Sequence, residues 1–189
     1  MSQPTKRKTV LSREKWLEMA IDALAYKCKS KFSLDSLLNV MPVTKGSFYS
    51  HFKNRGDFLL ALVEYWDRHE TKSVIDQLKA LPEDMSAQDR LWELMCVIYE
   101  MNFNQYELLI RSLTREVPVI EEAVKAVDQK RLETVGRLFA EMGFEGEELQ
   151  MRTLVFVTTT SQDGNVFSNL SPESYQRQLK LRHAFFIRP

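Results

Sequence analysis

Residues that break helices are rare in this chain. Its 189 residues include only six glycines and six prolines, while hydrophobic residues make up 44% of the total. Apolar side chains recur at helical spacing along most of the sequence, and no segment shows the alternating pattern of a strand. The sequence therefore predicts an all-α protein with a substantial buried core.

Capping residues mark where the helices start and end. Ser12, Ser33 and Thr44 are candidate N-caps, because a hydroxyl oxygen there accepts a free amide hydrogen. Pro42 lacks an amide hydrogen and disfavours helix in the residue before it, so it ends one short helix. Gly143 follows a long periodic run and is expected to cap its end. We expect helices near residues 12–27, 33–39, 44–52, 54–81, 87–102, 106–116, 119–142, 147–167 and 172–186.

Charge is divided unevenly along a chain whose net charge is zero. Residues 1–56 contain eleven Lys and Arg against four Asp and Glu, a balance of +7, and residues 57–189 contain fifteen against twenty-two, a balance of −7. A basic N-terminal part suggests a polyanionic partner for that part alone, although chance clustering of solvated charges gives the same pattern. We expect two domains, 1–56 with a basic arm at 1–11, and 57–189.

The N-terminal part contains three short helices within about 45 residues, with a tight turn between the second and third. This is the outline of a helix-turn-helix, in which the third helix enters the major groove of DNA. Phe48 and Phe52 lie four residues apart and are expected to pin that helix to the other two. On its other faces, polar residues can reach bases or phosphates, and a glycine without a side chain lets backbone and DNA approach closely. They are Thr44, Lys45, Gly46, Ser47, Tyr49, His51 and Lys53.

Residues 33–62, SLDSLLNVMPVTKGSFYSHFKNRGDFLLAL, resemble the signature of TetR-type transcriptional regulators. The run Lys-Gly-Ser-aromatic-Tyr-x-His-Phe at 45–52 carries the match, which covers about the first 65 residues. The chain departs from the family at Pro42, where glycine is usual, at Leu38, where alanine is usual, and at Asp35, where many members have a polar or basic residue.

The resemblance implies a helical ligand-binding and dimerisation domain after the helix-turn-helix. It further implies a homodimeric, ligand-responsive repressor that binds a palindromic operator. Lys6, Arg7 and Lys8 resemble the flexible basic arm that some members lay along DNA. The resemblance also implies contacts to bases or phosphates, or a cap beside them, for Ser33, Thr44, Lys45, Ser47, Tyr49, His51 and Arg55.

Three sets in the C-terminal part allow functional as well as structural interpretations. One is ordinary core or the wall of an apolar effector pocket: Trp92, Met95, Cys96, Tyr99, Phe103 and Phe156. Residues 158–163, TTTSQD, are unusual within a helix, and they line a subunit seam, contact a ligand or mark a frayed end. The resemblance implies a four-helix bundle across a two-fold axis. Its expected interface residues are Phe156, Thr160, Phe167, Leu179 and Phe185.

Two other classes of function are weighed against DNA binding. The sequence has no Gly-rich phosphate loop, no metal-ligand cluster and no nucleophile elbow, so we expect neither an enzyme nor a cofactor. A helical dimerisation or adaptor protein, whose basic part binds something other than DNA, is the nearer alternative. Salt-sensitive binding to duplex DNA separates these classes from a regulator.

Location follows from what the sequence does not contain. No apolar run approaches the roughly 18–20 residues that span a bilayer, and the basic N-terminus lacks the apolar block of a secretory signal. Cys28 and Cys96 form no metal-ligand pattern, so they are reduced core thiols or, alternatively, include a regulatory thiol. We expect a cytoplasmic protein with no membrane partner, associated with the nucleoid when bound to DNA.

Overall fold

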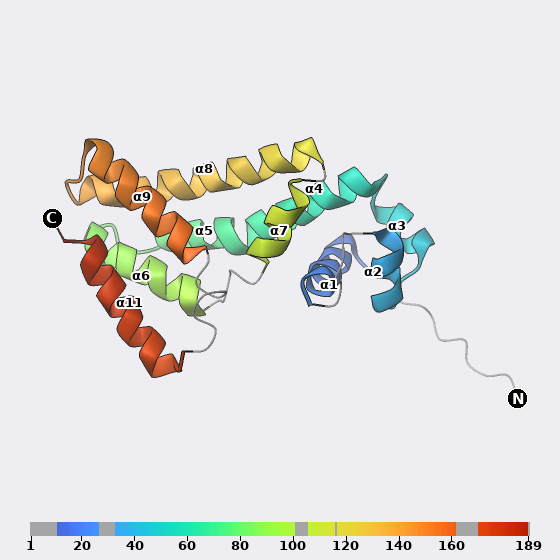
Figure 1. Ribbon diagram of the computed structural model, residues 1–189, viewed down its shortest axis with the longest axis horizontal. Helices are drawn as coiled ribbons and strands as arrows, with labels where there is room; N and C mark the ends of the chain where they lie inside the picture. Colours follow the sequence, from blue (N-terminus) through green and yellow to red (C-terminus); the bar gives the residue numbers. More distant parts are fainter. Residues whose placement is uncertain (1–10, 27–32, 101–105, 116, 162–169, 189) are drawn as a thin grey trace, which may run out of the picture. The chain divides into compact units, whose positions relative to one another are not determined.

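The structure, a computed structural model, describes residues 11–26, 33–100, 106–115, 117–161 and 170–188, and all regular elements in these ranges are helices. The expected all-α fold is confirmed. The helices are α1 (Arg13–Tyr26), α2 (Leu34–Val40), α3 (Lys45–His51), α4 (Arg55–Trp66), the π-helix η1 (Asp67–Lys72), α5 (Ser73–Lys79), α6 (Ala87–Glu100), α7 (Glu107–Leu113), α8 (Pro118–Glu141), α9 (Gly146–Thr160) and α11 (Pro172–Phe186) (Figure 1).

The predicted helix starts agree with the observed ones to within one residue. The ends agree less well. The helix expected over 106–116 stops at Leu113, and the end expected near residue 167 lies outside the described residues.

The chain divides into two compact units, Met1–Tyr65, here called the head, and Trp66–Pro189, here called the body. The sequence placed this division after residue 56. The structure places it later because α4 contributes to the core of the head. The fully buried ring of Phe58 lies 5.5 Å from that of Trp16 and 5.4 Å from that of Phe48, centroid to centroid.

Side-chain caps and one proline set the lengths of α2 and α3. Ser33 Oγ and Thr44 Oγ1 each accept the backbone amide three residues further on, at 3.0 Å and 3.1 Å. Between the helices, Met41 has φ −108° and ψ 142°, the extended conformation that a following proline favours. Met41 is also buried. The turn thus contains Pro42 and no glycine in the left-handed conformation.

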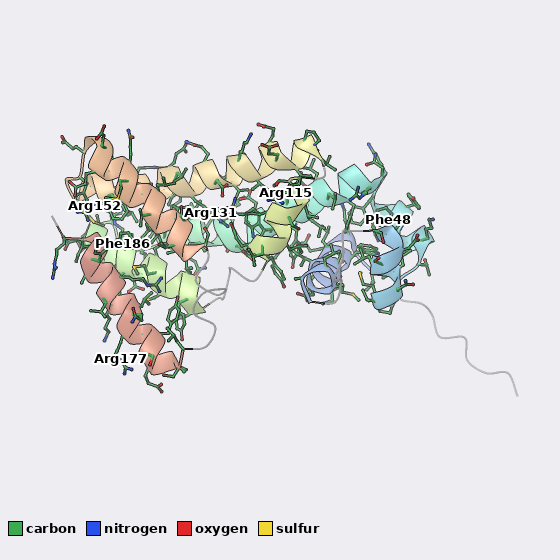
Figure 2. All side chains as sticks on the ribbon, viewed as in Figure 1. Phe48, Arg115, Arg131, Arg152, Arg177 and Phe186 are labelled. Atoms are coloured by element: carbon green, nitrogen blue, oxygen red, sulfur yellow. The ribbon has the colours of Figure 1, made fainter. Side chains whose placement is uncertain are left out.

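Aromatic side chains form the core of the head. Every pair among four rings has a centroid separation between 5.0 and 5.6 Å, and most pairs meet edge to face. The predicted pinning of α3 is confirmed, because two of the rings come from the segment that forms α3 and its C-cap. The four are Trp16, Phe48 (labelled in Figure 2), Phe52 and Phe58, each at most 1% exposed.

The body is organised around α8, a helix of 24 residues that packs against α6, α7 and α9 (Figure 1). Helix α6 packs in turn against α5 and α11. The ring of Phe186 on α11 lies 6.0 Å from Phe139 of α8 and 5.2 Å from Phe156 of α9, centroid to centroid. Helices α8, α9 and α11 therefore share one apolar core.

The long helix predicted after residue 54 is helical throughout, but its middle section, η1, is a π-helix. At its end, the amide of Ser73 donates to the carbonyl of Arg68, five residues earlier. Within this section the neighbours Glu70 and Thr71 both face inward, at 6% and 2% exposure. Such π-turns are often found at functional sites.

Helix α8 ends at a glycine, as expected. Gly143 has a φ of +92°, a conformation that other residues rarely adopt. Its amide donates to the carbonyl of Ala140 at 2.9 Å, and the amide of Phe144 donates to the carbonyl of Phe139 at 3.2 Å. This is the Schellman pattern, and the two phenyl rings, 6.0 Å apart, supply its apolar contact.

We expect Gly143→Ala to lower the free energy of unfolding by about 1 kcal/mol. The new methyl group meets no atom within 4 Å, so the loss comes from backbone strain alone. Gly136→Ala is the matched control within α8: its Cβ would meet the Thr153 side chain at an ordinary 3.6 Å, and alanine favours helix over glycine. Urea denaturation followed by circular dichroism compares the two variants. A loss of stability in both, or in neither, would contradict this account of the cap.

Candidate functional site

The candidate nucleic-acid interface is the outward side of α3. Thr44, Lys45 and Gly46 are exposed where the helix begins, and the Tyr49 ring, one turn later, is 55% exposed. The same ring packs edge-on against Phe48, with centroids 5.1 Å apart. The phenol is therefore positioned by the aromatic core and still lies on the surface.

Other predicted DNA-binding residues lie at the ends of the same short helices. Ser33 is exposed and caps α2, while Ser47 is half-buried and donates its amide to the Thr44 cap. Lys53 and Arg55 are exposed in the segment that leads from α3 into α4. The structure thus gathers these residues around α3, and their contacts with DNA stay a prediction.

His51 has a partner within the protein. Its imidazole Nε2 lies 2.9 Å from the carbonyl oxygen of Leu11, and the side chain is half-buried. This hydrogen bond ties the chain before α1 to the last turn of α3. The resemblance assigned His51 to a DNA phosphate, and such a contact through Nε2 requires the bond to Leu11 to open.

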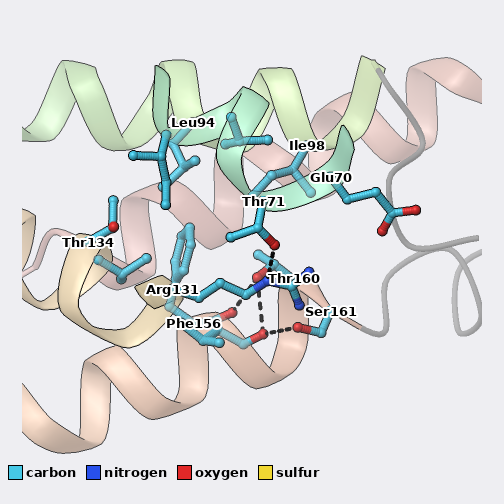
Figure 3. Close-up of a pocket in the computed structure, with 13 residues that line it drawn as sticks. Glu70, Thr71, Leu94, Ile98, Arg131, Thr134, Phe156, Thr160 and Ser161 are labelled. Carbon is cyan, nitrogen blue, oxygen red and sulfur yellow. Dashed lines mark hydrogen bonds between the residues drawn. The ribbon is translucent and has the colours of Figure 1, made fainter. Parts of the chain in front are cut away.

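The body contains a second candidate site, a small open pocket among η1, α5, α6, α8 and α9 (Figure 3). Its volume of about 60 Å³ leaves room for only a few non-hydrogen atoms. Aliphatic side chains and one phenyl ring form most of its wall. Its polar lining residues are Glu70, Thr71, Arg131, Thr134, Thr160 and Ser161.

Arg131 of α8 is held in this pocket by contacts on several sides. Its Nε donates to Thr71 Oγ1 at 2.9 Å, and its Nη1 donates to Glu107 Oε2 at 3.1 Å. The guanidinium carbon also lies 4.7 Å from the centre of the Trp66 ring. Glu107 is fully buried, and its other oxygen accepts a hydrogen bond from Arg111 Nε at 2.7 Å.

Glu70 lies at the same polar end of the pocket. Its Oε2 accepts a hydrogen bond from Trp66 Nε1 at 2.8 Å, whereas Oε1 is buried with no hydrogen-bond partner among the described residues. Burial raises the pKa of Glu70 to about 8, although the charge of Arg131 and the bond from Trp66 act in the opposite direction. At neutral pH, Glu70 is therefore mostly protonated.

Of the predicted effector-pocket residues, Phe156 lines this pocket. Met95 is buried in the core of the body, the Tyr99 ring stacks on Tyr175 with centroids 4.2 Å apart, and the Trp92 ring meets His183 at 5.4 Å. Cys96 is half-buried, and burial raises the pKa of its thiol. Phe103 lies outside the described residues, as do Lys6, Arg7 and Lys8 of the predicted arm.

The sequence did not single out three residues that shape the pocket: Glu70, Thr71 and Arg131. Glu70 and Arg131 stand in charged, periodic segments that have the pattern of solvated helix faces. An apolar spacing pattern cannot show which of these charges a π-turn or a distant partner brings inside.

The threonine-rich run at the end of α9 is regular helix. The hydroxyls of Thr158, Thr159, Thr160 and Ser161 each donate to the carbonyl four residues earlier, all at 2.7 Å. Thr160 and Ser161 also line the pocket, which favours the ligand-contact interpretation for these two. Gln162 and Asp163 lie outside the described residues.

The predicted subunit interface needs a correction. Phe156, Thr160 and Leu179 are 1%, 7% and 4% exposed, so the structure assigns them to the interior of one chain. Phe185 is on the surface, at 67% exposure, and Phe167 lies outside the described residues. Further exposed apolar side chains on α9 and α11 are Met151, Leu154 and Leu181.

The described residues contain neither a membrane-spanning helix nor a metal-binding cluster. No helix among them is both long and apolar enough to cross a membrane. Nor do three or more of their His, Cys, Asp and Glu side chains gather in a way that could hold a metal ion.

Comparison with known proteins supports the same fold. No protein-family model matches the chain. The transcriptional regulator AcuR of Cereibacter sphaeroides is 34% identical to it over 67 residues, which make up 35% of this chain and only 30% of AcuR. A crystal structure from Rhodococcus sp., of a protein assigned to the TetR family of transcriptional regulators, matches with a TM-score of 0.68 at 15% identity, over 93% of this chain and 99% of that one. The chain therefore has the fold of that TetR-family protein.

Glu70 predicts how stability depends on pH. Its folded pKa of about 8 exceeds its usual 4.5, so its stabilising contribution is complete below the usual value and is lost as pH rises toward 8. We expect the free energy of unfolding to fall across this window by up to about 1.4 kcal/mol per pH unit, and Glu70→Gln to flatten the fall. Urea denaturation at several pH values measures it. Glu64→Gln, at an exposed glutamate of α4, should keep the wild-type slope. A Glu70→Gln slope that matches wild type would contradict the assignment.

Proposed function

We propose that this chain is a TetR-type transcriptional regulator that binds duplex DNA through α3 and acts as a ligand-responsive repressor. One observation carries the proposal: α3 is fixed from within by buried rings and presents Lys45 and Tyr49 outward. A short helix locked onto two others, with a polar outer side, is what reading the major groove requires. The identity with AcuR over 67 residues and the shared fold support it.

Gly46 supports a close approach of DNA to α3. A Cβ at this position would meet only Thr44 Oγ1, at 3.8 Å, so packing within the described part of the protein does not require glycine there. The missing side chain leaves space outside the helix instead. In the proposed complex, Lys45 and Thr44 face base edges or nearby phosphates, and Tyr49 donates to a phosphate oxygen.

The proposed regulator is a homodimer that pairs through the exposed sides of α9 and α11. These helices are neighbours, because Arg152 Nη1 of α9 donates to the carbonyl of Phe186 at 2.7 Å. Leu154 on α9 and Leu181 and Phe185 on α11 are 58%, 64% and 67% exposed. A dimer with a two-fold axis through this apolar surface carries two copies of α3, which matches the two half-sites, about 34–36 Å apart, of a palindromic operator.

We expect Lys45→Ala to weaken operator binding and to lower the slope of log affinity against log salt by about 1, because one phosphate contact is lost. Tyr49→Phe keeps the ring against Phe48 but removes the hydroxyl, and should weaken binding by about tenfold. Fluorescence anisotropy with a genomically selected duplex measures both.

Lys79→Ala is the control, since this exposed lysine lies on α5 in the body. This variant should bind DNA as tightly as the wild type does. If the unmodified protein binds duplex DNA with no dependence on salt, the adaptor or enzyme alternatives are favoured. Unchanged affinity in both head variants would remove α3 from the interface.

Leu154→Glu should convert the proposed dimer to a monomer, because a dimer would bury the new charge at its two-fold contact. Leu108→Glu is the matched control, at a leucine of α7 that is 54% exposed outside the α9–α11 surface. Sedimentation velocity compares them. If both variants keep the wild-type oligomeric state, the α9–α11 surface is not the interface.

A further inference from the structure

The pocket in the body combines an apolar wall with one accessible cation. Val74, Leu94, Val135 and Phe156 contribute apolar surface from α5, α6, α8 and α9. Into this space extends Arg131, whose side chain keeps 16% exposure (Figure 3). A ligand that fills the pocket therefore meets hydrocarbon on most sides and a guanidinium at one end.

Arg131 is oriented by the protein but not saturated by it. A guanidinium carries five N–H donors in a fixed plane. Thr71 and Glu107 accept from Nε and Nη1, and no described residue accepts a hydrogen bond from Nη2. Because two contacts and the Trp66 ring fix the plane, the remaining donors keep one direction, which suits the planar oxygens of a carboxylate.

The neighbouring acids do not offer a matching site for a cation. Glu107 is 0% exposed and already pairs with Arg111 and Arg131. Glu70 uses Oε2 for Trp66, and its Oε1 is shut off from solvent. Glu70 is also mostly neutral at neutral pH, so it does not repel an anion at Arg131. An amine in the same pocket would find no accessible carboxylate.

The size of the pocket favours a short anion. A cavity of about 60 Å³ holds a few non-hydrogen atoms, so only a short hydrocarbon would be enclosed against its apolar wall. Arg131 is the one cationic side chain that lines the pocket among the described residues, so a second carboxylate would lack a partner.

We propose that this pocket binds a short monocarboxylate, with the carboxylate on Arg131 and Thr71 and the hydrocarbon against Leu94, Val135 and Phe156. Binding itself is independent of what the head does. The regulatory consequence, that the carboxylate shifts operator affinity, rests on the proposed function, and requires the ligand to prefer one DNA-binding state.

Isothermal titration of the full-length protein with propanoate, butanoate and 2-methylpropanoate tests the proposal, beside the matching amides and amines. We expect at least one carboxylate to bind and its amide to bind about tenfold or more weakly, because a charge-assisted hydrogen bond is lost. Binding of the amine or amide as tight as that of the acid would overturn the assignment, and so would the absence of binding by every acid.

Variants locate the site. Arg131→Gln should weaken carboxylate binding by about tenfold or more, while Arg137→Gln, at an exposed arginine of the same helix, should not. Arg131→Gln also removes a partner of buried Glu107 and can destabilise the fold. Ile98→Phe is therefore a second variant that tests the site without changing Arg131. Its larger side chain fills the pocket without touching the ion pairs and should abolish binding in a folded protein. Carboxylate binding that survives Ile98→Phe would place the ligand elsewhere.

The two proposals fail separately. Carboxylate binding without any DNA binding would leave the pocket assignment standing and end the proposed function. Salt-sensitive DNA binding without carboxylate binding would do the reverse.

Discussion

Helix α3 is stabilised by aromatic rings that pack against its buried side. Isolated helices shorter than about 12–15 residues are marginal in water, and α3 has only seven. Phe48 of α3 and Phe52, the C-cap of α3, bury their rings against Trp16 and Phe58. This burial supplies the stability that the helix lacks by itself. The same spacing that turns positions 48 and 52 inward turns positions 45 and 49 outward. One packing event therefore both forms the helix and decides what it presents.

In the body, a charged network takes a comparable role. Glu107 is fully buried and accepts hydrogen bonds from two guanidinium groups, Arg111 on its own helix and Arg131 on α8. Arg111 also makes two bonds to Asp128 of α8, at 3.0 and 2.8 Å. Burying such charges is costly unless each is paired. The pairs that join α7 to α8 thus also set the position of Arg131 in the pocket.

The sequence was informative wherever a local signal decides the structure. Ser33 and Thr44 cap because a hydroxyl at those positions meets an amide three residues away, and Gly143 ends α8 because its backbone needs a positive φ. Phe48 and Phe52 were assigned to the core by spacing alone. Contacts across long sequence distances were not accessible in this way. His51 to Leu11 and Arg131 to Glu107 depend on how helices dock, which no periodicity encodes.

The same limit explains why predicted interface residues are buried within one chain. Phe156 and Leu179 lie on apolar stripes, and a stripe shows only that one side of a helix is covered. Whether the cover is the same chain or a second copy depends on the number of helices around it. Phe139 and Phe186 already pack against Phe156, so the same chain covers this residue, and the exposed apolar side chains of α9 and α11 are others: Met151, Leu154, Leu181 and Phe185.

The π-helical section η1 lies in sequence between α4 and α5 and contributes to the pocket in the body. Glu70 and Thr71 of η1 both face inward, and the hydroxyl of Thr71 holds Arg131 Nε. Two residues of one six-residue hydrogen-bond pattern therefore shape the polar end of the pocket.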